Sequence, residues 1–147
     1  MKQVSRSALV SFSAEQMYAL VNDVSSYPQF LPGCSGSQVL ESTETSMVAS
    51  VDVSKAGISK TFTTSNQLNH GQSIIMNLVD GPFSSLTGGW YFTPLDEGAC
   101  KVELKLEFEF SSKMVELAFG KIFSDLTSNM VSSFTKRAKE VYSCYEY

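Results

Sequence analysis

The side chains that most often carry catalysis are few in this sequence and lie far apart. His70 is the only histidine, and it falls between Asn69 and Gly71 in a predicted hairpin turn. That is a poor position for the general base of a nucleophile–histidine–acid triad. Asp23 and Asp80 are isolated carboxylates near predicted turns, where capping is their usual role. The sequence therefore favours a binding protein over an enzyme.

The three cysteines, Cys34, Cys100 and Cys144, are odd in number and include no Cys-x-x-Cys pair. Widely spaced cysteines of this kind are typical of reduced thiols rather than of a disulfide framework. They form no cluster with the histidine that would predict a zinc site. We therefore expect neither a metal nor a resident cofactor.

Composition and charge limit the partners. The 147 residues most simply form one domain, residues 1–147, and the ten phenylalanines and six methionines suit a large or loosely filled interior. The net charge of −4 gives no general attraction to nucleic acid. DNA is not an expected partner, and an RNA or ribosome partner would need a local basic patch.

The N-terminal stretch MKQVSRSALVSF carries charges and serines where a signal peptide needs an apolar core. No apolar run approaches the length of a transmembrane helix. We expect a cytoplasmic protein whose contact with the inner membrane, if any, is peripheral.

Hydrophobic periodicity predicts the elements that position the candidate residues. Residues 2–12 alternate as a strand, and Ser13 with Gln16 forms the capping box of a short helix that ends before Pro28. Alternation continues through several strands, most clearly in CKVELKLEFEF at 100–110. From Ser112 to about Tyr142 the period is helical, which gives a helix roughly 45 Å long.

This order predicts an α+β fold of the helix-grip type. A curved antiparallel sheet of about seven strands has one apolar face, and only the long C-terminal helix can cover it. A curved sheet touches a straight helix imperfectly, so the large apolar side chains between them could line a cavity or fill it.

Residues 27–34, YPQFLPGC, place apolar side chains in a connection between elements. Tyr27, Phe30, Leu31 and Pro32 could form a lid over the cavity or dip into a membrane to collect a lipid. The alternative is that they close the bottom of the core.

Two further groups are candidates for the cavity wall. In the group around Gly88-Gly89, the glycines predict a bulge or the close approach of another backbone. The alternative is an aromatic core with a bend in the sheet. The group on the C-terminal helix is predicted to belong to the core, and the same helix face would also form the cavity wall. The groups are Phe119, Phe123, Met130 and Phe134 on the helix, and Phe83, Leu86, Trp90 and Phe92 around Gly88-Gly89.

Cationic residues give two more candidates. Arg6 has the parity of the apolar face of its strand, so it could meet a carbonyl oxygen of a ligand, or it could extend to solvent over its apolar stem. Lys136, Arg137 and Lys139 near the helix end could contact ribosomal RNA, together with Lys55, Lys60 and Lys121. Solvated charges that complement the helix dipole are the alternative.

Two motifs, YPQFLP at 27–32 and GPFSSLTGGWYFTPL at 81–95, resemble the coenzyme Q-binding START-domain family of the polyketide cyclase/dehydrase-like superfamily. The resemblance covers essentially the whole chain and is strongest to a bacterial branch of ribosome association toxins. It implies a START / Bet v 1-like helix-grip fold with a hydrophobic tunnel. The chain departs from the mitochondrial motif YPxFLPWC at Gly33, which removes one large apolar contact from the predicted lid.

The resemblance implies two functions. The first is non-enzymatic binding of ubiquinone or a similar polyisoprenoid lipid in the tunnel, in support of respiration. The alternative, implied by the bacterial branch, is binding to the large ribosomal subunit, which blocks its joining with the small one and inhibits translation. One role uses the interior and the other the surface, so a single chain could perform both.

Overall fold

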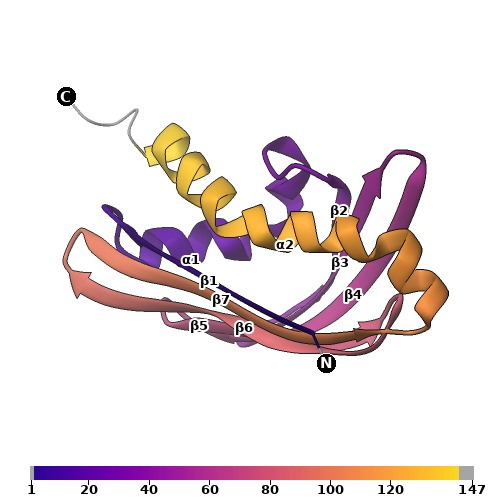
Figure 1. Cartoon of the computed structure of the whole chain (residues 1–147). Coiled ribbons are helices and arrows are strands. Elements are labelled where there is room, and N and C mark those ends of the chain that lie inside the picture. The colour runs from indigo at the N-terminus through magenta and orange to yellow at the C-terminus, as the bar shows by residue number, and fades with distance from the viewer. Residues whose placement is uncertain (1, 143–147) are drawn as a thin grey trace.

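The computed structural model describes residues 2–142, in which seven strands form one antiparallel sheet (Figure 1). The strands are β1 (Lys2–Val10), β2 (Cys34–Ser42), β3 (Ser46–Lys55), β4 (Ile58–Asn69), β5 (Ser73–Asp80), β6 (Phe83–Asp96) and β7 (Ala99–Phe110). Their order in the sheet is β1-β7-β6-β5-β4-β3-β2, so β1 and β2 are its edges. The predicted antiparallel sheet is confirmed.

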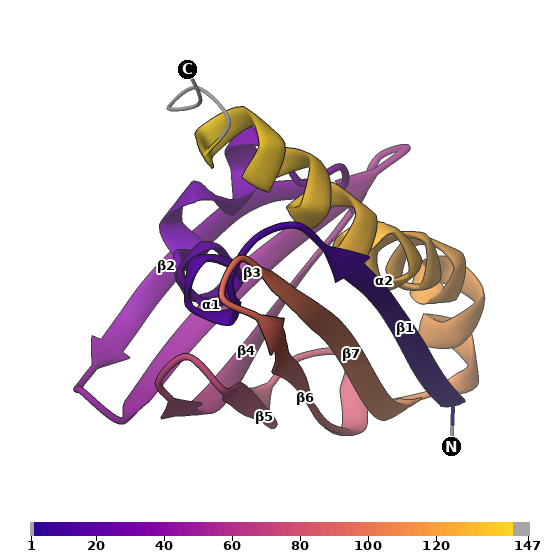
Figure 2. The ribbon, with the colours of Figure 1, turned by 90° about the vertical axis from the view of Figure 1, so that its left-hand side faces the viewer.

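Three helical segments accompany the sheet: α1 (Ala14–Asn22), the 3-10 helix η1 (Val24–Gln29) and α2 (Lys113–Tyr142). Figure 2 shows the sheet curling so that its concave side is open toward α2, which runs across the opening. The helix-grip fold is thereby confirmed. No helix among the described residues combines the length and apolarity that crossing a bilayer requires.

Local hydrogen bonds set the helix starts where the sequence placed them. The Ser13 hydroxyl accepts from the Gln16 amide at 3.1 Å, and the Gln16 side chain accepts from the Ser13 amide at 2.9 Å. This is the predicted capping box. At the start of α2, the Ser112 hydroxyl accepts from the Val115 amide at 3.1 Å. Both caps satisfy backbone donors that the first helical turn leaves unpaired.

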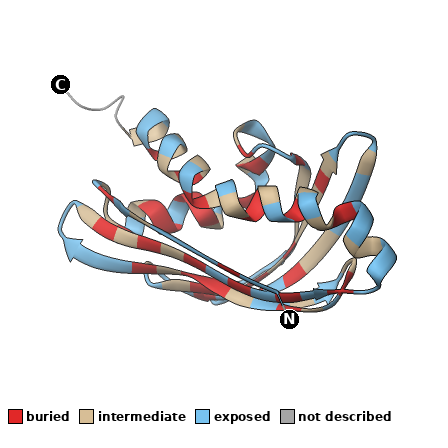
Figure 3. Ribbon diagram, in the orientation of Figure 1, coloured by how far each residue is buried: buried red, intermediate tan, exposed pale blue. Residues whose placement is uncertain are grey.

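Burial follows the concave side of the sheet. On β7, alternate residues from Cys100 to Phe110 are buried, as the alternation predicts. Figure 3 shows buried residues recurring along the strands and along α2. The core therefore lies between one face of the sheet and one stripe of α2.

Gly88 and Gly89 lie at a close approach of neighbouring strands. A Cβ on Gly88 would lie 2.1 Å from the carbonyl oxygen of Lys105, and one on Gly89 would lie 2.9 Å from that of Ile74. The register of β6 with β7 runs through both glycines without a shift. Of the two predicted explanations, the close backbone approach is confirmed and the bulge is wrong.

The two edges of the sheet differ. The pairing of β1 with β7 is regular from Lys2 to Val10, and β1 also packs against α2. The pairing of β2 with β3 has register shifts between Cys34 and Gly36 and between Val39 and Glu41. One edge is thus continuous and neighboured by a helix, and the other is interrupted.

Candidate functional site

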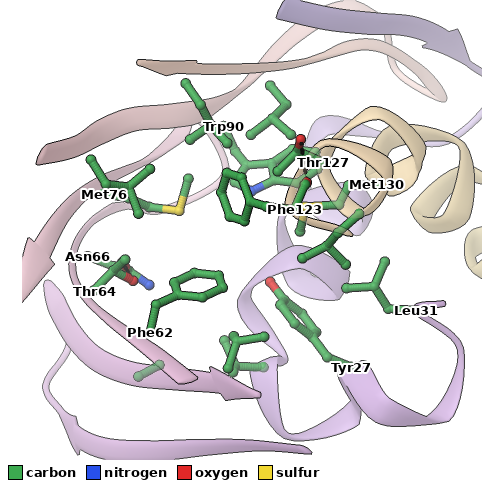
Figure 4. A pocket seen from close by; sticks show the side chains of 17 residues that line it. Tyr27, Leu31, Phe62, Thr64, Asn66, Met76, Trp90, Phe123, Thr127 and Met130 are labelled. Atoms are coloured by element: carbon green, nitrogen blue, oxygen red, sulfur yellow. Dashed lines mark hydrogen bonds between the residues drawn. The ribbon is translucent and has the colours of Figure 1, made fainter. Parts of the chain in front are cut away.

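A cavity of about 60 Å³ lies between α2 and the concave face of the sheet (Figure 4). One water molecule needs about 10–15 Å³ of such space. The cavity therefore has room for a small group, and a long prenyl chain would have to displace wall side chains. Its lining residues are Val24, Tyr27, Leu31, Ala49, Val51, Phe62, Thr64, Asn66, Met76, Leu86, Trp90, Leu104, Leu106, Phe123, Leu126, Thr127 and Met130.

The wall is mostly apolar, and its non-aromatic polar side chains are Thr64, Asn66 and Thr127. The Thr127 hydroxyl donates to the Phe123 carbonyl at 3.0 Å and so bonds within its own helix. The Thr64 hydroxyl donates to the Asn66 side-chain oxygen at 2.8 Å. Thr64 and Asn66 are both buried, so β4 contributes a polar pair to an otherwise apolar wall.

Tyr27 and Leu31 place the motif segment inside the molecule. They are 6% and 3% exposed, and both line the cavity. The Tyr27 hydroxyl donates to the Val21 carbonyl, and burial raises the pKa of Tyr27 well above its usual range. Pro28 and Pro32 are exposed. The segment therefore closes the core with two of its side chains and presents its prolines to solvent.

Phe30 lies outside the cavity and is fixed against the last part of α2. Its ring centroid is 5.2 Å from that of Phe134, and the Arg137 guanidinium lies 5.1 Å from the Phe30 centroid. Arg137 also donates to the Gln29 side-chain oxygen at 3.1 Å. A cation over an aromatic face and a hydrogen bond together attach the motif segment to α2.

Gly33, where the sequence departs from the mitochondrial motif, has a φ of +90°, a region that favours glycine. A Cβ there would lie 3.8 Å from Leu126, a residue of the cavity wall. A side chain at this position would therefore begin next to the wall.

The structure brings about half of the predicted ligand-binding residues to the cavity. Tyr27, Leu31, Leu86, Trp90, Phe123 and Met130 line it; Phe83, Phe92, Phe119 and Phe134 are buried outside its wall, and Phe30, Pro32 and Arg6 lie toward the surface. Phe92 packs against Tyr18, with 5.9 Å between the ring centroids. Most of the predicted residues off the wall are therefore ordinary core.

Phe83 and Phe119 belong to a packed group of rings, here called the aromatic cluster, that fills the space beside the cavity. The centroids of Phe83 and Phe123 are 4.8 Å apart, and those of Phe108 and Phe123 are 4.9 Å apart. Edge-to-face contacts at such distances stabilise aromatic groups beyond the burial of their area. The cluster consists of Phe62, Phe83, Phe108, Phe110, Phe119 and Phe123.

Sequence reasoning missed the polar pair on β4. Thr64 and Asn66 share their strand parity with Phe62 and Leu68, two apolar residues of β4. Parity alone would have placed both side chains inside. Both residues were missed because a polar residue in an alternating strand is usually assigned to the solvent-exposed face.

Arg6 lies outside the cavity, and the inward placement expected from its parity is wrong. Its guanidinium donates to the Ser5 carbonyl at 3.0 Å and reaches the Ser128 hydroxyl on α2 at 3.4 Å. Because β1 is an edge strand, the long side chain of Arg6 extends past α2 to the surface, which agrees with the alternative interpretation.

Arg6 instead lines a surface groove between β1 and α2, here called the β1–α2 groove. Three cationic side chains line it, and no acidic one does. Arg137, which the sequence grouped with Lys136 and Lys139, is directed at Gln29 and Phe30. The groove residues are Arg6, Ser7, Ala8, Ser128, Val131, Ser132, Thr135, Lys136 and Lys139.

The chemically reactive side chains do not assemble. Cys34 and Cys100 are buried free thiols, and burial raises the pKa of each. Cys144 lies outside the described residues. His70 makes a surface contact with Glu15 at 3.0 Å. Within residues 2–142, no group of three His, Cys, Asp or Glu side chains could hold a metal.

Comparison with known proteins places the chain among relatives of the same fold. A ribosome association toxin named RatA from Vibrio cholerae is 80% identical over 97% of this chain and 99% of its own. Coenzyme Q-binding protein COQ10 homolog B, mitochondrial, from Xenopus laevis is 28% identical over 98% of this chain and 61% of its own. The crystal structure of the Zhui aromatase/cyclase from Streptomyces sp. R1128 has a TM-score of 0.86, with 16% identity and 99% of both chains covered. That likeness concerns the fold alone.

A family model described as polyketide cyclase / dehydrase and lipid transport matches residues 10–135. The resemblance inferred from the two sequence motifs is confirmed. The chain belongs to the polyketide cyclase / dehydrase and lipid transport family, with a RatA relative at 80% identity.

Proposed function

We propose that this protein is a non-enzymatic cytoplasmic factor that binds the large ribosomal subunit and blocks its joining with the small one. The observation that carries the proposal is the 80% identity, over 97% of the chain, to a protein named ribosome association toxin. Ribosome association requires a surface rather than a catalytic group.

The β1–α2 groove supports the proposal electrostatically. Ribosomal RNA presents a dense array of phosphates, and a chain of net charge −4 is repelled by it unless its cations are concentrated on one surface. Arg6, Lys136 and Lys139 provide such a concentration. Ser7 and Ser132 line the same groove, and hydroxyls are common hydrogen-bond donors to phosphate oxygens.

The experiment is cosedimentation with purified large subunits across a salt series, together with ribosome profiles of overexpressing cells. We expect the wild type to pellet with large subunits, and binding to weaken as salt rises, because neutralised phosphates release counterions. Arg6→Glu with Lys136→Glu and Lys139→Glu should abolish binding and restore joined ribosomes.

The matched control is Lys55→Glu with Lys60→Glu and Lys121→Glu, which changes the charge equally at the other lysines named from the sequence. It should bind nearly as the wild type does. If the groove variant still bound the large subunit, the β1–α2 groove would not be the ribosome-binding surface. A wild type that leaves the subunits in the supernatant and the profiles unchanged would reject the function itself.

A second function, binding of ubiquinone or another apolar ligand, is favoured by the apolar cavity. Burial of apolar surface contributes about 25 cal/mol per Å², so a ring and a few isoprene units could bind without a catalytic group. Met76 and Met130 in the wall have flexible side chains that can move to admit a larger ligand. Lipid extraction and mass spectrometry of protein purified without detergent should recover a stoichiometric apolar compound. Recovery of none would count against this function and leave the ribosomal one standing.

A further inference from the structure

We propose that Asn66 is a specificity-determining residue of the cavity, where its side-chain amide nitrogen donates a hydrogen bond to a neutral carbonyl oxygen of a flat apolar ligand. This inference rests on the second function proposed above, the binding of an apolar ligand. It adds the side chain of this protein that recognises the carbonyl group of the ligand.

Asn66 is held in a fixed orientation on the cavity wall. It is 7% exposed, lines the cavity, and sits on β4 between Met47 of β3 and Met76 of β5. The hydrogen bond from Thr64 engages its side-chain oxygen at 2.8 Å. Figure 4 shows Asn66 and Thr64 together on the β4 side of the cavity, near Met76 and Phe62. The carboxamide therefore cannot turn freely.

The amide nitrogen of Asn66 remains available as a donor. Among residues 2–142 it donates to no other group, since the bond from Thr64 is the one hydrogen bond of this side chain. Asn66 lines the cavity, so this donor borders space that a ligand oxygen could occupy (Figure 4). A buried donor without an acceptor is costly, because it has lost its hydrogen bond to water. A ligand oxygen in the cavity would remove that cost.

The surroundings restrict the acceptor to a neutral one. No cationic side chain lines the cavity, so a carboxylate or phosphate would be buried without a counter-charge. Trp90, Phe62 and Phe123 present flat aromatic surfaces to the same space. A planar ring that carries a carbonyl group, as in a quinone or an aromatic ketone, satisfies both conditions.

The test uses two probes of almost equal shape. Duroquinone and durene both carry four ring methyl groups, and only duroquinone has carbonyl oxygens. Duroquinone has no open ring position, so it cannot add to the cysteine thiols. Equilibrium dialysis should show that wild-type protein binds duroquinone about tenfold more tightly than durene, as a single buried hydrogen bond allows.

Asn66→Leu should remove this preference and bind the two probes equally. It removes an unpaired donor but also the acceptor of the Thr64 hydroxyl, so its urea midpoint should stay close to that of the wild type. Thr64→Val is the matched variant on the same strand: it keeps the amide donor and should retain most of the preference. In the wild type, NMR should show the Asn66 side-chain amide resonances shifting with duroquinone and not with durene. That measurement stands even if the leucine variant does not fold.

Equal binding of both probes by the wild type would overturn the inference and leave apolar ligand binding intact. The inference would also fail if Asn66→Leu kept the duroquinone preference, or if the amide resonances did not respond. A wild type that binds neither probe would overturn both the inference and the second function.

Discussion

The aromatic cluster and the cavity are neighbours under the same helix, and they share Phe62 and Phe123, yet one is filled and the other is open. In the cluster, flat rings meet edge to face, with the Phe83 and Phe123 centroids 4.8 Å apart. In the cavity, Ala49 and Val51 face larger side chains across the space. The strand side chains opposite α2 are large rings in the cluster, whereas those of the cavity include the small side chains of Ala49 and Val51.

This difference teaches that a void in such a core comes from short side chains opposite a helix that cannot move closer. The rings of the cluster already hold α2 at a fixed distance from β6 and β7, because aromatic contacts have preferred separations. Where the strand residues are small, that distance leaves space. The cluster therefore acts as a spacer for the cavity.

The largest expected effect is on the cluster. Phe83→Ala removes a buried ring with five ring neighbours and should lower the free energy of unfolding by about 3–5 kcal/mol. Phe62→Ala, at the border with the cavity, should cost only about 1–2 kcal/mol because its ring is already partly exposed. Urea unfolding of both variants measures the difference. Equal losses would contradict the division into a packed region and an open one.

A smaller effect is expected in the motif segment. Leu31→Ser places a hydroxyl at a buried wall position and should cost about 2–3 kcal/mol. Phe30→Ser, which removes a half-buried ring outside the cavity, should cost about 1 kcal/mol. Thermal and urea unfolding give both values. If Leu31→Ser were as stable as the wild type, the segment would be a lid and not part of the core.

The smallest effect should follow from filling the space. Ala49→Val adds two methyl groups to the wall and should change stability by about 1 kcal/mol or less, as a gain if the methyls fit. It should also abolish binding of the apolar probes. Ala8→Val on β1 makes the same change away from the cavity and serves as the control in equilibrium dialysis. Unchanged probe binding by Ala49→Val would place the ligand site elsewhere.

Much of the fold could be read from local patterns in the sequence. The alternation in residues 100–110 predicted β7, and Ser13 with Gln16 predicted the start of α1, because both depend on residues close together in the chain. The cover of the concave face also followed, since only one predicted helix was long enough. Local hydrogen bonds and periodicity carry this information.

The site was less predictable because it depends on distances between elements. Aromatic residues were expected in the wall, but Phe83 and Phe119 pack against other rings instead. Asn66 has the inward parity, and only the position of α2 shows that it faces space. Arg6 also has that parity, but its edge strand lets the side chain leave the interior. The parity of a residue in its strand predicts which face of the sheet its side chain is on, but it does not predict what packs against that side chain.

The two sheet edges have a consequence for self-association. An exposed, regular edge strand offers unpaired backbone groups on which a strand of another molecule can add, the first step toward aggregation. The register shifts in β2 interrupt that row of donors and acceptors, and α2 packs beside β1 at the opposite edge. For these two different reasons, both edge strands, β1 and β2, are poor templates for the addition of further strands. A sheet that must stay curved around its helix is thereby kept from growing.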